Sequence, residues 1–169
     1  MSIHYRDATL GDWEQIDRLF RTGFCDTFAH LYAPEDLDAF LAQFTPEAWQ
    51  QELADEGFAF RLAEDGSQAA GYVKLGPLHL PVEPQGPAIE LRQLYVSKAW
   101  HGCGIADELM QWALQTARHR CAGEIYLSVY TDNHRARRFY GRHGFTFVAP
   151  YTFMVGNHAD EDIILRLEL

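Results

Sequence analysis

The sequence predicts one α/β or α+β domain with a mixed β-sheet, spanning residues 1–169. A chain of this length forms one domain by the usual prior and buries roughly 70% of its unfolded surface. Hydrophobic residues make up 47% and charged residues 22% of the chain, as in globular rather than disordered or fibrous proteins. After an alternating segment at 3–8, apolar residues follow a helical period up to about residue 57, and strand and helix patterns alternate after it. Such switching indicates helices that cover a sheet.

The first half of the chain carries clear helix-start signals. Thr9 with Asp12 three residues later is typical of a helix start, and Thr45 with Pro46 supplies a cap and a first helical residue. Gly57 ends the helix that Thr45 begins. We therefore expect a strand at 3–8, a helix from Thr9 to about His30, a helix from Pro34 to about Phe44, a helix at 45–56, and strands at 58–64 and 69–75.

Prolines and glycines divide the second half. Four of the seven prolines fall between residues 76 and 87, which predicts a loop because proline cannot donate to a sheet ladder. Gly144 is the expected C-terminal glycine of a helix, and Gly156-Asn157 joins the last two strands. The expected elements are strands at 88–96, 124–130, 145–155 and 162–169, and helices from Gly104 and from Asn133 to His143.

Composition excludes several functions. The net charge of −10 argues against a nucleic-acid partner, and no apolar run approaches the roughly 20 residues that span a bilayer. The first seven residues lack the layout of a signal peptide. The chain has three cysteines, Cys25, Cys103 and Cys121, an odd number that favours free thiols and a reduced cytoplasmic setting. Neither the cysteines nor the histidines have the sequence spacing of metal ligands, so we expect no metal site.

The negative charge is concentrated at the beginning of the chain. Residues 1–65 hold fourteen acidic residues against four arginines, whereas residues 66–169 hold ten charges of each sign. One interpretation is that the solvated faces of the N-terminal helices are acidic. The other is an electrostatic field that attracts a cation.

A glycine-containing turn leads into the helix that begins at Gly104. It follows the strand that ends at Val96 and has the sequence His101-Gly102-Cys103-Gly104. Backbone N–H groups at a helix start suit a phosphate, but a tight turn with a helix cap explains the same residues. The three-glycine spacing of a dinucleotide fingerprint and the Gly-Lys-Ser/Thr of a Walker loop are both missing.

A second motif follows the strand at 124–130. The pattern Asn-x-x-Ala-x-x-Phe-Tyr-x-x-x-Gly-Phe matches at Asn133, Ala136, Phe139, Tyr140, Gly144 and Phe145. With the upstream glycine turn, this segment resembles the GNAT superfamily of N-acetyltransferases. In the family's upstream pattern, Gly104 and Ala106 match, whereas His101 replaces the usual glutamine or arginine. The resemblance implies a mostly antiparallel sheet of six to seven strands, with helices on both faces.

The resemblance also implies the site residues. Acetyl-CoA, used as a co-substrate, would contact Leu94, Tyr95, Val96, His101, Gly102, Cys103, Gly104, Ile105, Ala106 and Asn133. Glu90 would be the catalytic base, directly or through water, and a two-residue period puts it on one face with Arg92, Leu94 and Val96. Tyr140 would be the acid for the thiolate.

Each of these residues has a structural alternative. Glu90 could simply pair with Arg92 or be solvated, Tyr140 could pack its helix onto the sheet, and Asn133 could be only a helix cap. Cys103 has no evident base partner and direct acetyl transfer needs no acyl-enzyme, so we expect no nucleophilic role for it.

A narrower likeness concerns the acceptor. Segments 27–32, 35–37, 71–75 and 153–156, followed by Asp162, look like the bacterial PaiA-type branch, which is associated with polyamine acetylation. This likeness favours a small cationic amine, such as spermidine or spermine, as acceptor. The alternatives are an amine of a protein or peptide, or a non-catalytic acyl-CoA-binding module. Many relatives form homodimers, but no interface is readable from the sequence.

Overall fold

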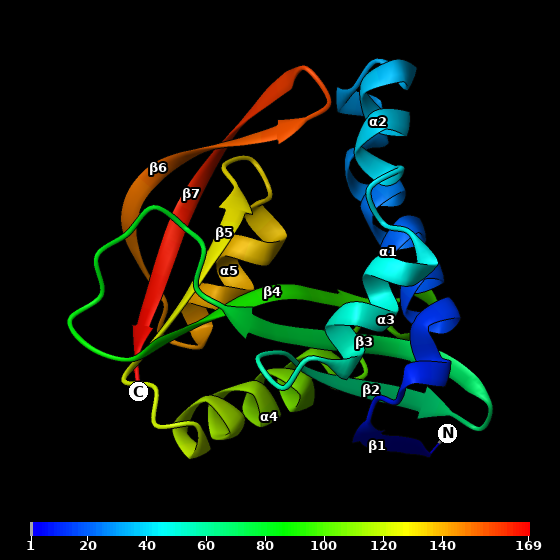
Figure 1. Ribbon diagram of the computed structural model, residues 1–169, viewed down its shortest axis with the longest axis horizontal. Helices are drawn as coiled ribbons and strands as arrows, with labels where there is room; N and C mark the ends of the chain where they lie inside the picture. Colours follow the sequence, from blue (N-terminus) through cyan, green and yellow to red (C-terminus); the bar gives the residue numbers. More distant parts are fainter. Residues whose placement is uncertain (1) are drawn as a thin grey trace.

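The computed structural model describes residues 2–169 and contains one seven-stranded sheet (Figure 1). The strands are β1 (Ile3–Asp7), β2 (Ala59–Asp65), β3 (Gln68–Pro77), β4 (Ala88–Val96), β5 (Glu124–Tyr130), β6 (Thr146–Val155) and β7 (His158–Glu168). The helices are α1 (Trp13–Phe28), α2 (Pro34–Leu41), α3 (Pro46–Ala54), α4 (Ile105–His119) and α5 (His134–Arg142). In the sheet the strands follow the order β1-β2-β3-β4-β5-β7-β6, and only β4 and β5 pair in parallel. The predicted fold class is confirmed.

Helices cover both faces of this sheet. Buried residues of α4, such as Leu109 and Met110, pack with Leu91 and Ile125 in one apolar cluster. On the other face, α1, α2 and α3 form a cluster rich in aromatic residues. In residues 2–169 no helix has the length and apolar character that crossing a bilayer requires.

Helix starts follow their predicted signals, while three bounds differ, and the first is that α2 ends at Leu41 rather than near Phe44. Thr9 caps a short 3₁₀ turn that leads into α1, and the side chain of Thr45 accepts a hydrogen bond from the Ala48 amide. The α1 helix ends at Phe28 rather than near His30, because a separate 3₁₀ turn follows it. We expected β7 to begin at residue 162, but it begins at His158.

The early start of β7 has a local cause. Gly156 and Asn157 form a two-residue hairpin loop, and Val155 pairs directly with His158. Gly156 has φ +56°, the left-handed conformation that tight hairpin loops require. Because the loop is so short, pairing continues through the polar segment at 158–161, which we did not predict as strand. The consequence is that Asp160 and Asp162 lie buried on the sheet.

A β-bulge interrupts β4. Leu91 pairs with Leu75 and Gln93 pairs with Lys74, so Arg92 has no pairing partner of its own on β3. An extra residue reverses the in–out alternation of the side chains that follow it. The prediction that residues 90, 92, 94 and 96 share one face is therefore wrong.

A partly buried ion-pair network ties β1 to the start of α1. The guanidinium of Arg6 donates to both carboxylate oxygens of Asp12 at 2.8 Å and to Glu64 at 2.7 Å. Hydrogen bonding to Arg6 lowers the pKa of Asp12 from 3.8 to about 2. A depressed carboxylate pKa stabilises the folded state above the unfolded-state pKa, and this stabilisation is lost as the pH falls.

We therefore expect Asp12→Asn to reduce the free energy of unfolding by about 2 kcal/mol at pH 7. The difference from wild type should shrink as the pH falls from about 4 toward 2, as measured by urea unfolding. Asp7→Asn is the matched control, because Asp7 also pairs with an arginine, Arg61, but its side chain is 76% exposed. This control should cost less than about 1 kcal/mol, and equal losses in the two variants would contradict the prediction.

Candidate active site

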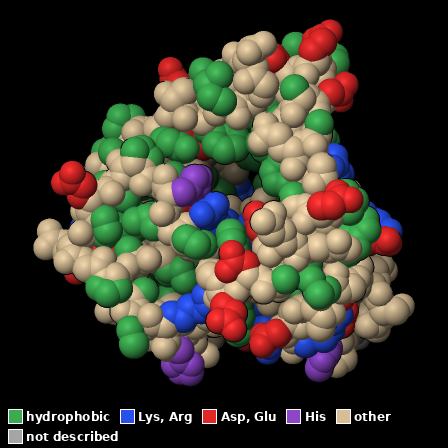
Figure 2. Space-filling model, in the orientation of Figure 1, with side chains coloured by type: hydrophobic (Ala, Val, Ile, Leu, Met, Phe, Trp, Pro, Cys, Tyr) green, Lys and Arg blue, Asp and Glu red, His purple; other side chains and the backbone are tan. Residues whose placement is uncertain are grey.

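A cleft opens where β4 and β5 separate. The two strands pair only from Ala88 to Glu90 and from Glu124 to Tyr126, and then diverge (Figure 1). Figure 2 shows the surface hollowed between the N-terminal helices and the β5–α5 segment. The cleft has a volume of about 1330 Å³, above the range of about 300–1,000 Å³ that is usual for small-molecule pockets. It is large enough for two substrates side by side.

The glycine turn forms one end of this cleft. Gly102 and Gly104 have φ +79° and +80°, and Gly104 is the N-cap of α4. The first N–H groups of the helix have no partner within the helix, and Arg135, Arg138 and Arg142 also line the cleft. Free N–H groups beside guanidinium groups suit a phosphate-bearing ligand.

Nine of the ten predicted cofactor residues line this cleft, and the exception is Cys103. The Cys103 side chain is exposed, and the thiol donates weakly to the His101 carbonyl at 3.9 Å. Asn133 lines the cleft and also caps α5, since its side chain accepts a hydrogen bond from the Ala136 amide at 3.3 Å. The two interpretations of Asn133 are therefore compatible.

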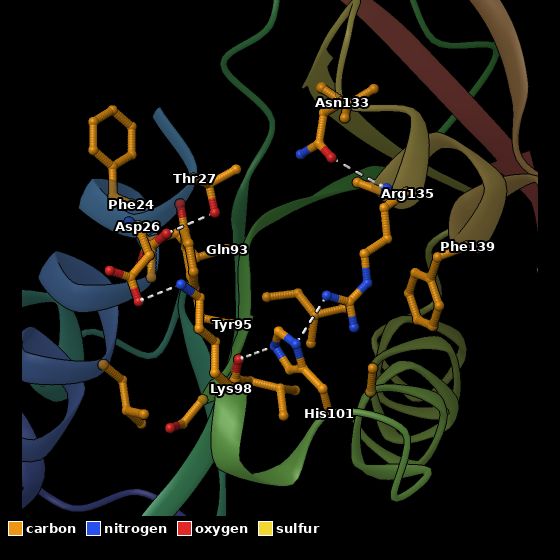
Figure 3. A pocket seen from close by; sticks show the side chains of 18 of the residues that line it. Phe24, Asp26, Thr27, Gln93, Tyr95, Lys98, His101, Asn133, Arg135 and Phe139 are labelled. Carbon is orange, nitrogen blue, oxygen red and sulfur yellow. Dashed lines mark hydrogen bonds and ion pairs between the residues drawn. The ribbon is translucent and has the colours of Figure 1, made fainter. Parts of the chain in front are cut away.

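His101 links two walls of the cleft (Figure 3). Its Nε2 lies 2.8 Å from the Val96 carbonyl oxygen, and its Nδ1 lies 2.8 Å from a guanidinium nitrogen of Arg135. A carbonyl only accepts and a guanidinium only donates, so in this arrangement Nε2 donates and Nδ1 accepts. The residue that departs from the family pattern thus connects the end of β4 to α5.

Tyr140 reaches the cleft from α5. It is buried against Phe139 and Phe145, with ring centroids 5.4 and 5.8 Å away. Burial raises the pKa of its phenol to about 12. The hydroxyl therefore stays protonated near neutral pH and can act as a hydrogen-bond donor.

Glu90 does not line the cleft. Its carboxylate accepts a hydrogen bond from the His79 amide at 3.1 Å, and it lies 2.7 Å from the His79 ring and 3.2 Å from Nε of Arg92. Because of the bulge at Arg92, the side chains of Glu90 and Leu94 point to opposite faces of the sheet. The structure therefore brings Tyr140 and the cofactor residues together without Glu90.

The two buried acidic residues of the cleft come from β7. Asp160 and Asp162 line it beside Tyr32 and Tyr130. The Tyr32 hydroxyl donates to Asp160, and His158 Nε2 lies 3.2 Å from the same carboxylate. Burial and the charge of Asp160 raise the pKa of Asp162 to about 7. Sequence reasoning did not select these two residues as a site, although their spacing of two on a strand was a usable signal.

The acidic N-terminal third contributes little to the cleft. Of its fourteen acidic residues only Asp26 lines it, and Asp26 lies 3.4 Å from the ammonium of Lys98. Others of this group pair with basic residues elsewhere, as Glu52 does with Lys74. Within the cleft, the buried negative charge therefore comes from Asp160 and Asp162 on β7 rather than from residues 1–65.

Comparison with known proteins identifies the family. Residues 13–145 match the acetyltransferase (GNAT) family. The chain belongs to the GNAT family. It is therefore an acyltransferase, and the resemblance drawn from residues 133–145 is confirmed at the level of the superfamily. Acetyl-CoA is the acyl donor of GNAT enzymes.

Individual GNAT relatives are similar along most of their length. An uncharacterized N-acetyltransferase of Mycobacterium tuberculosis is 31% identical over 138 residues, which cover 81% of this chain and 85% of that protein. An uncharacterized N-acetyltransferase from the pepI 3' region of Lactobacillus delbrueckii is 26% identical over 162 residues, which cover 94% of this chain and 92% of that protein.

Two solved GNAT structures illustrate the shared fold. The PaiA N-acetyltransferase of Thermoplasma acidophilum, in complex with coenzyme A, has a TM-score of 0.82 and 20% identity over 100% of both chains. Arabidopsis thaliana NAA60, in complex with a bisubstrate analogue, has a TM-score of 0.76 and 17% identity over 99% of both chains. At these identities the likeness establishes the fold alone.

Proposed function

We propose that this GNAT enzyme transfers the acetyl group of acetyl-CoA to a primary amine of a small cationic acceptor, with spermidine and spermine as the first candidates. One observation carries the proposal. A single cleft joins a glycine turn lined by arginines to a buried carboxylate pair, Asp160 and Asp162. The first end suits an anionic nucleotide, and the second suits an ammonium group.

In this proposal acetyl-CoA occupies the arginine-lined end. Its pyrophosphate would accept hydrogen bonds from the N–H groups at the start of α4, from Gly104 to Ala106. Its pantetheine arm would run along Leu94–Val96, where β4 has left its β5 partner. Separation of the strands supports this placement, because unpaired strand backbone offers hydrogen-bonding groups to a ligand.

The chemistry requires a neutral amine and a stabilised leaving group. An alkylammonium has a pKa of about 10.4 and must lose a proton before its nitrogen can attack the thioester carbon. Water in the cleft takes the first proton from the ammonium. As the C–N bond forms and the C–S bond breaks, the nitrogen gives up a second proton to water and the sulfur leaves as a thiolate. The phenol of Tyr140, kept protonated by burial, would donate to that sulfur. Cys103 has no part in this direct transfer.

An assay of CoA thiol release tests the proposal. Spermidine, spermine, single-charge alkylamines and peptides with free N-termini or lysines would be compared at equal concentration. The resemblance of segments 27–32 and 153–156 to the PaiA-type branch favours the polyamines, and peptides are the necessary comparison because protein amines are the alternative acceptors. Turnover of polyamines well above that of peptides is expected. The proposal would be overturned if only the peptides were acetylated, or if no acceptor released CoA faster than hydrolysis of acetyl-CoA does.

Salt should discriminate between acceptors by charge. We expect the KM of spermine to rise several-fold between 0.1 and 1 M NaCl, since the screening length falls from about 10 to about 3 Å over that range. The KM of butylamine, which has one charge, should rise less. Steady-state kinetics at saturating acetyl-CoA measures both, and an equal rise for the two amines would argue against electrostatic recognition.

A further inference from the structure

Asp162 occupies a central position on the acceptor side of the cleft. On β7 it pairs with Tyr130 of β5 on one side and with Tyr151 of β6 on the other. Paired residues of antiparallel strands point to the same face of a sheet. The Asp162 side chain therefore lies between two phenol side chains, on the face where the cleft is open.

The Asp162 carboxylate is not satisfied by the protein. Asp162 is only 8% exposed, and its Oδ1 is buried without a hydrogen-bond partner. Its neighbour Asp160, by contrast, has both Tyr32 and His158 as partners. A buried carboxylate oxygen without a donor is costly, so the atom is available to a donor that enters the cleft.

Aromatic rings complete the surroundings of this carboxylate. Phe28, Tyr32, Tyr130 and Phe153 line the same cleft, and the rings of Phe28 and Tyr130 meet edge to face at 6.0 Å. Aromatic faces attract an ammonium group. A carboxylate oxygen without a partner, set among such rings, selects a cation rather than a neutral donor.

We infer that Asp162 Oδ1 accepts a hydrogen bond from an ammonium group of the acceptor other than the amine that is acetylated. This inference rests on the proposed function and deepens it, because it requires an acceptor with at least two amino groups. The reacting nitrogen has to be neutral, whereas the nitrogen held by Asp162 keeps its charge. Asp162 would thus set specificity for di- and polyamines and take no part in the bond changes.

The electrostatic surroundings agree with this role. Tyr32, Tyr130, Tyr151 and Asp160 face Asp162, and His158 adds its charge through Asp160 when protonated. Burial first, and Asp160 second, raise the pKa of Asp162 to about 7. Selectivity for spermidine over hexylamine should therefore increase as the pH rises through about 7, because only the ionised carboxylate holds the ammonium.

The test compares Asp162→Asn with Glu161→Gln in the full chain. Glu161 is the next residue on β7 and is exposed, so it serves as the matched control. In Asp162→Asn we expect kcat/KM for spermidine to fall at least about tenfold, with little change for hexylamine and with the pH dependence of the selectivity lost. The control should behave as wild type. Asparagine keeps the shape of aspartate, so the variant should fold. Circular dichroism checks its secondary structure, and titration with acetyl-CoA checks that the cofactor end of the cleft is intact.

The outcomes separate the two proposals. Equal loss for spermidine and hexylamine, or no loss for either, overturns the role of Asp162 while amine acetylation stands. If wild type turns over no amine, the proposed function fails. Calorimetric titration of spermidine into the CoA-bound protein then tests the role of Asp162 by itself. Binding by wild type that is lost in Asp162→Asn would support the ammonium site, and equal binding or none would overturn it.

Discussion

Replacing Tyr140 by phenylalanine is expected to lower kcat by about 100-fold, the usual contribution of a positioned acid. The phenol is the buried donor that α5 brings to the cleft, and its pKa of about 12 keeps it protonated wherever the enzyme works. The leaving thiolate, with an ordinary pKa of about 8.5, would otherwise develop its charge without a donor. Burial also raises the pKa of a thiol, which brings the two groups closer in acidity.

The substitution removes one oxygen and leaves the packing intact. A phenylalanine ring at position 140 still fits against Phe139 and Phe145, so the melting temperature and the Kd for acetyl-CoA should remain close to wild type. Tyr5→Phe, on β1 and outside the cleft lining, is the control for loss of a hydroxyl. A Tyr140→Phe enzyme whose kcat stays within about threefold of wild type would lack the effect expected of an acid, and Tyr140 would then be a packing residue.

Elements with strong local signals could be predicted from sequence. Thr45 and Pro46 start α3 as expected, and the motif from Asn133 to Phe145 located α5 together with Tyr140. These signals depend on residues within one or two turns of each other. Local rules of capping and spacing were therefore sufficient for most of the helices, whereas the expected cofactor residues came from the family resemblance that this motif carries.

The parts that could not be predicted depend on partners distant in sequence. The bulge at Arg92 exists only in the register between β3 and β4. An alternation rule applied to β4 alone therefore placed Glu90 on the same face as Leu94 and Val96, which is wrong. Likewise, residues 158–161 were not predicted as strand, and Asp160 and Asp162 become buried because β7 is held between β5 and β6. The divergence of β4 from β5 is also a property of the whole sheet.

A second large effect is expected at the β6–β7 turn, where Gly156→Ala should lower the free energy of unfolding by about 3 kcal/mol. Gly156 has φ +56°, and a Cβ placed there would lie 2.6 Å from the Asp36 Cα and 2.8 Å from the Asp36 carbonyl oxygen. Backbone atoms cannot rotate away as a side chain can. The Asn157 amide also donates to the Asp36 carboxylate at 2.8 Å, so relieving the clash would break this contact between α2 and the turn.

Gly66→Ala is the matched control for this effect. Gly66 sits in the β2–β3 turn with φ +62°, but nothing lies within 4 Å of a Cβ there. Its substitution should cost only the backbone strain of about 1 kcal/mol, as measured by urea unfolding with equal m-values. Equal losses of unfolding free energy in the two variants would mean that α2 moves away from the new methyl group at almost no cost.

The same turn connects fold stability to acceptor binding. Phe153 and Asp160 pair across the β6–β7 hairpin, two residues from the pair Val155–His158 that closes it. Tyr32, just before α2, donates to Asp160 from the other side. Displacing the turn from α2 should therefore disturb the carboxylate pair while the glycine turn before α4 stays in place. Gly156→Ala is expected to raise the KM for a polyamine several-fold and to leave the Kd for acetyl-CoA unchanged, because the two ends of the cleft belong to different parts of the sheet. A parallel loss of acetyl-CoA affinity would show that the ends are coupled.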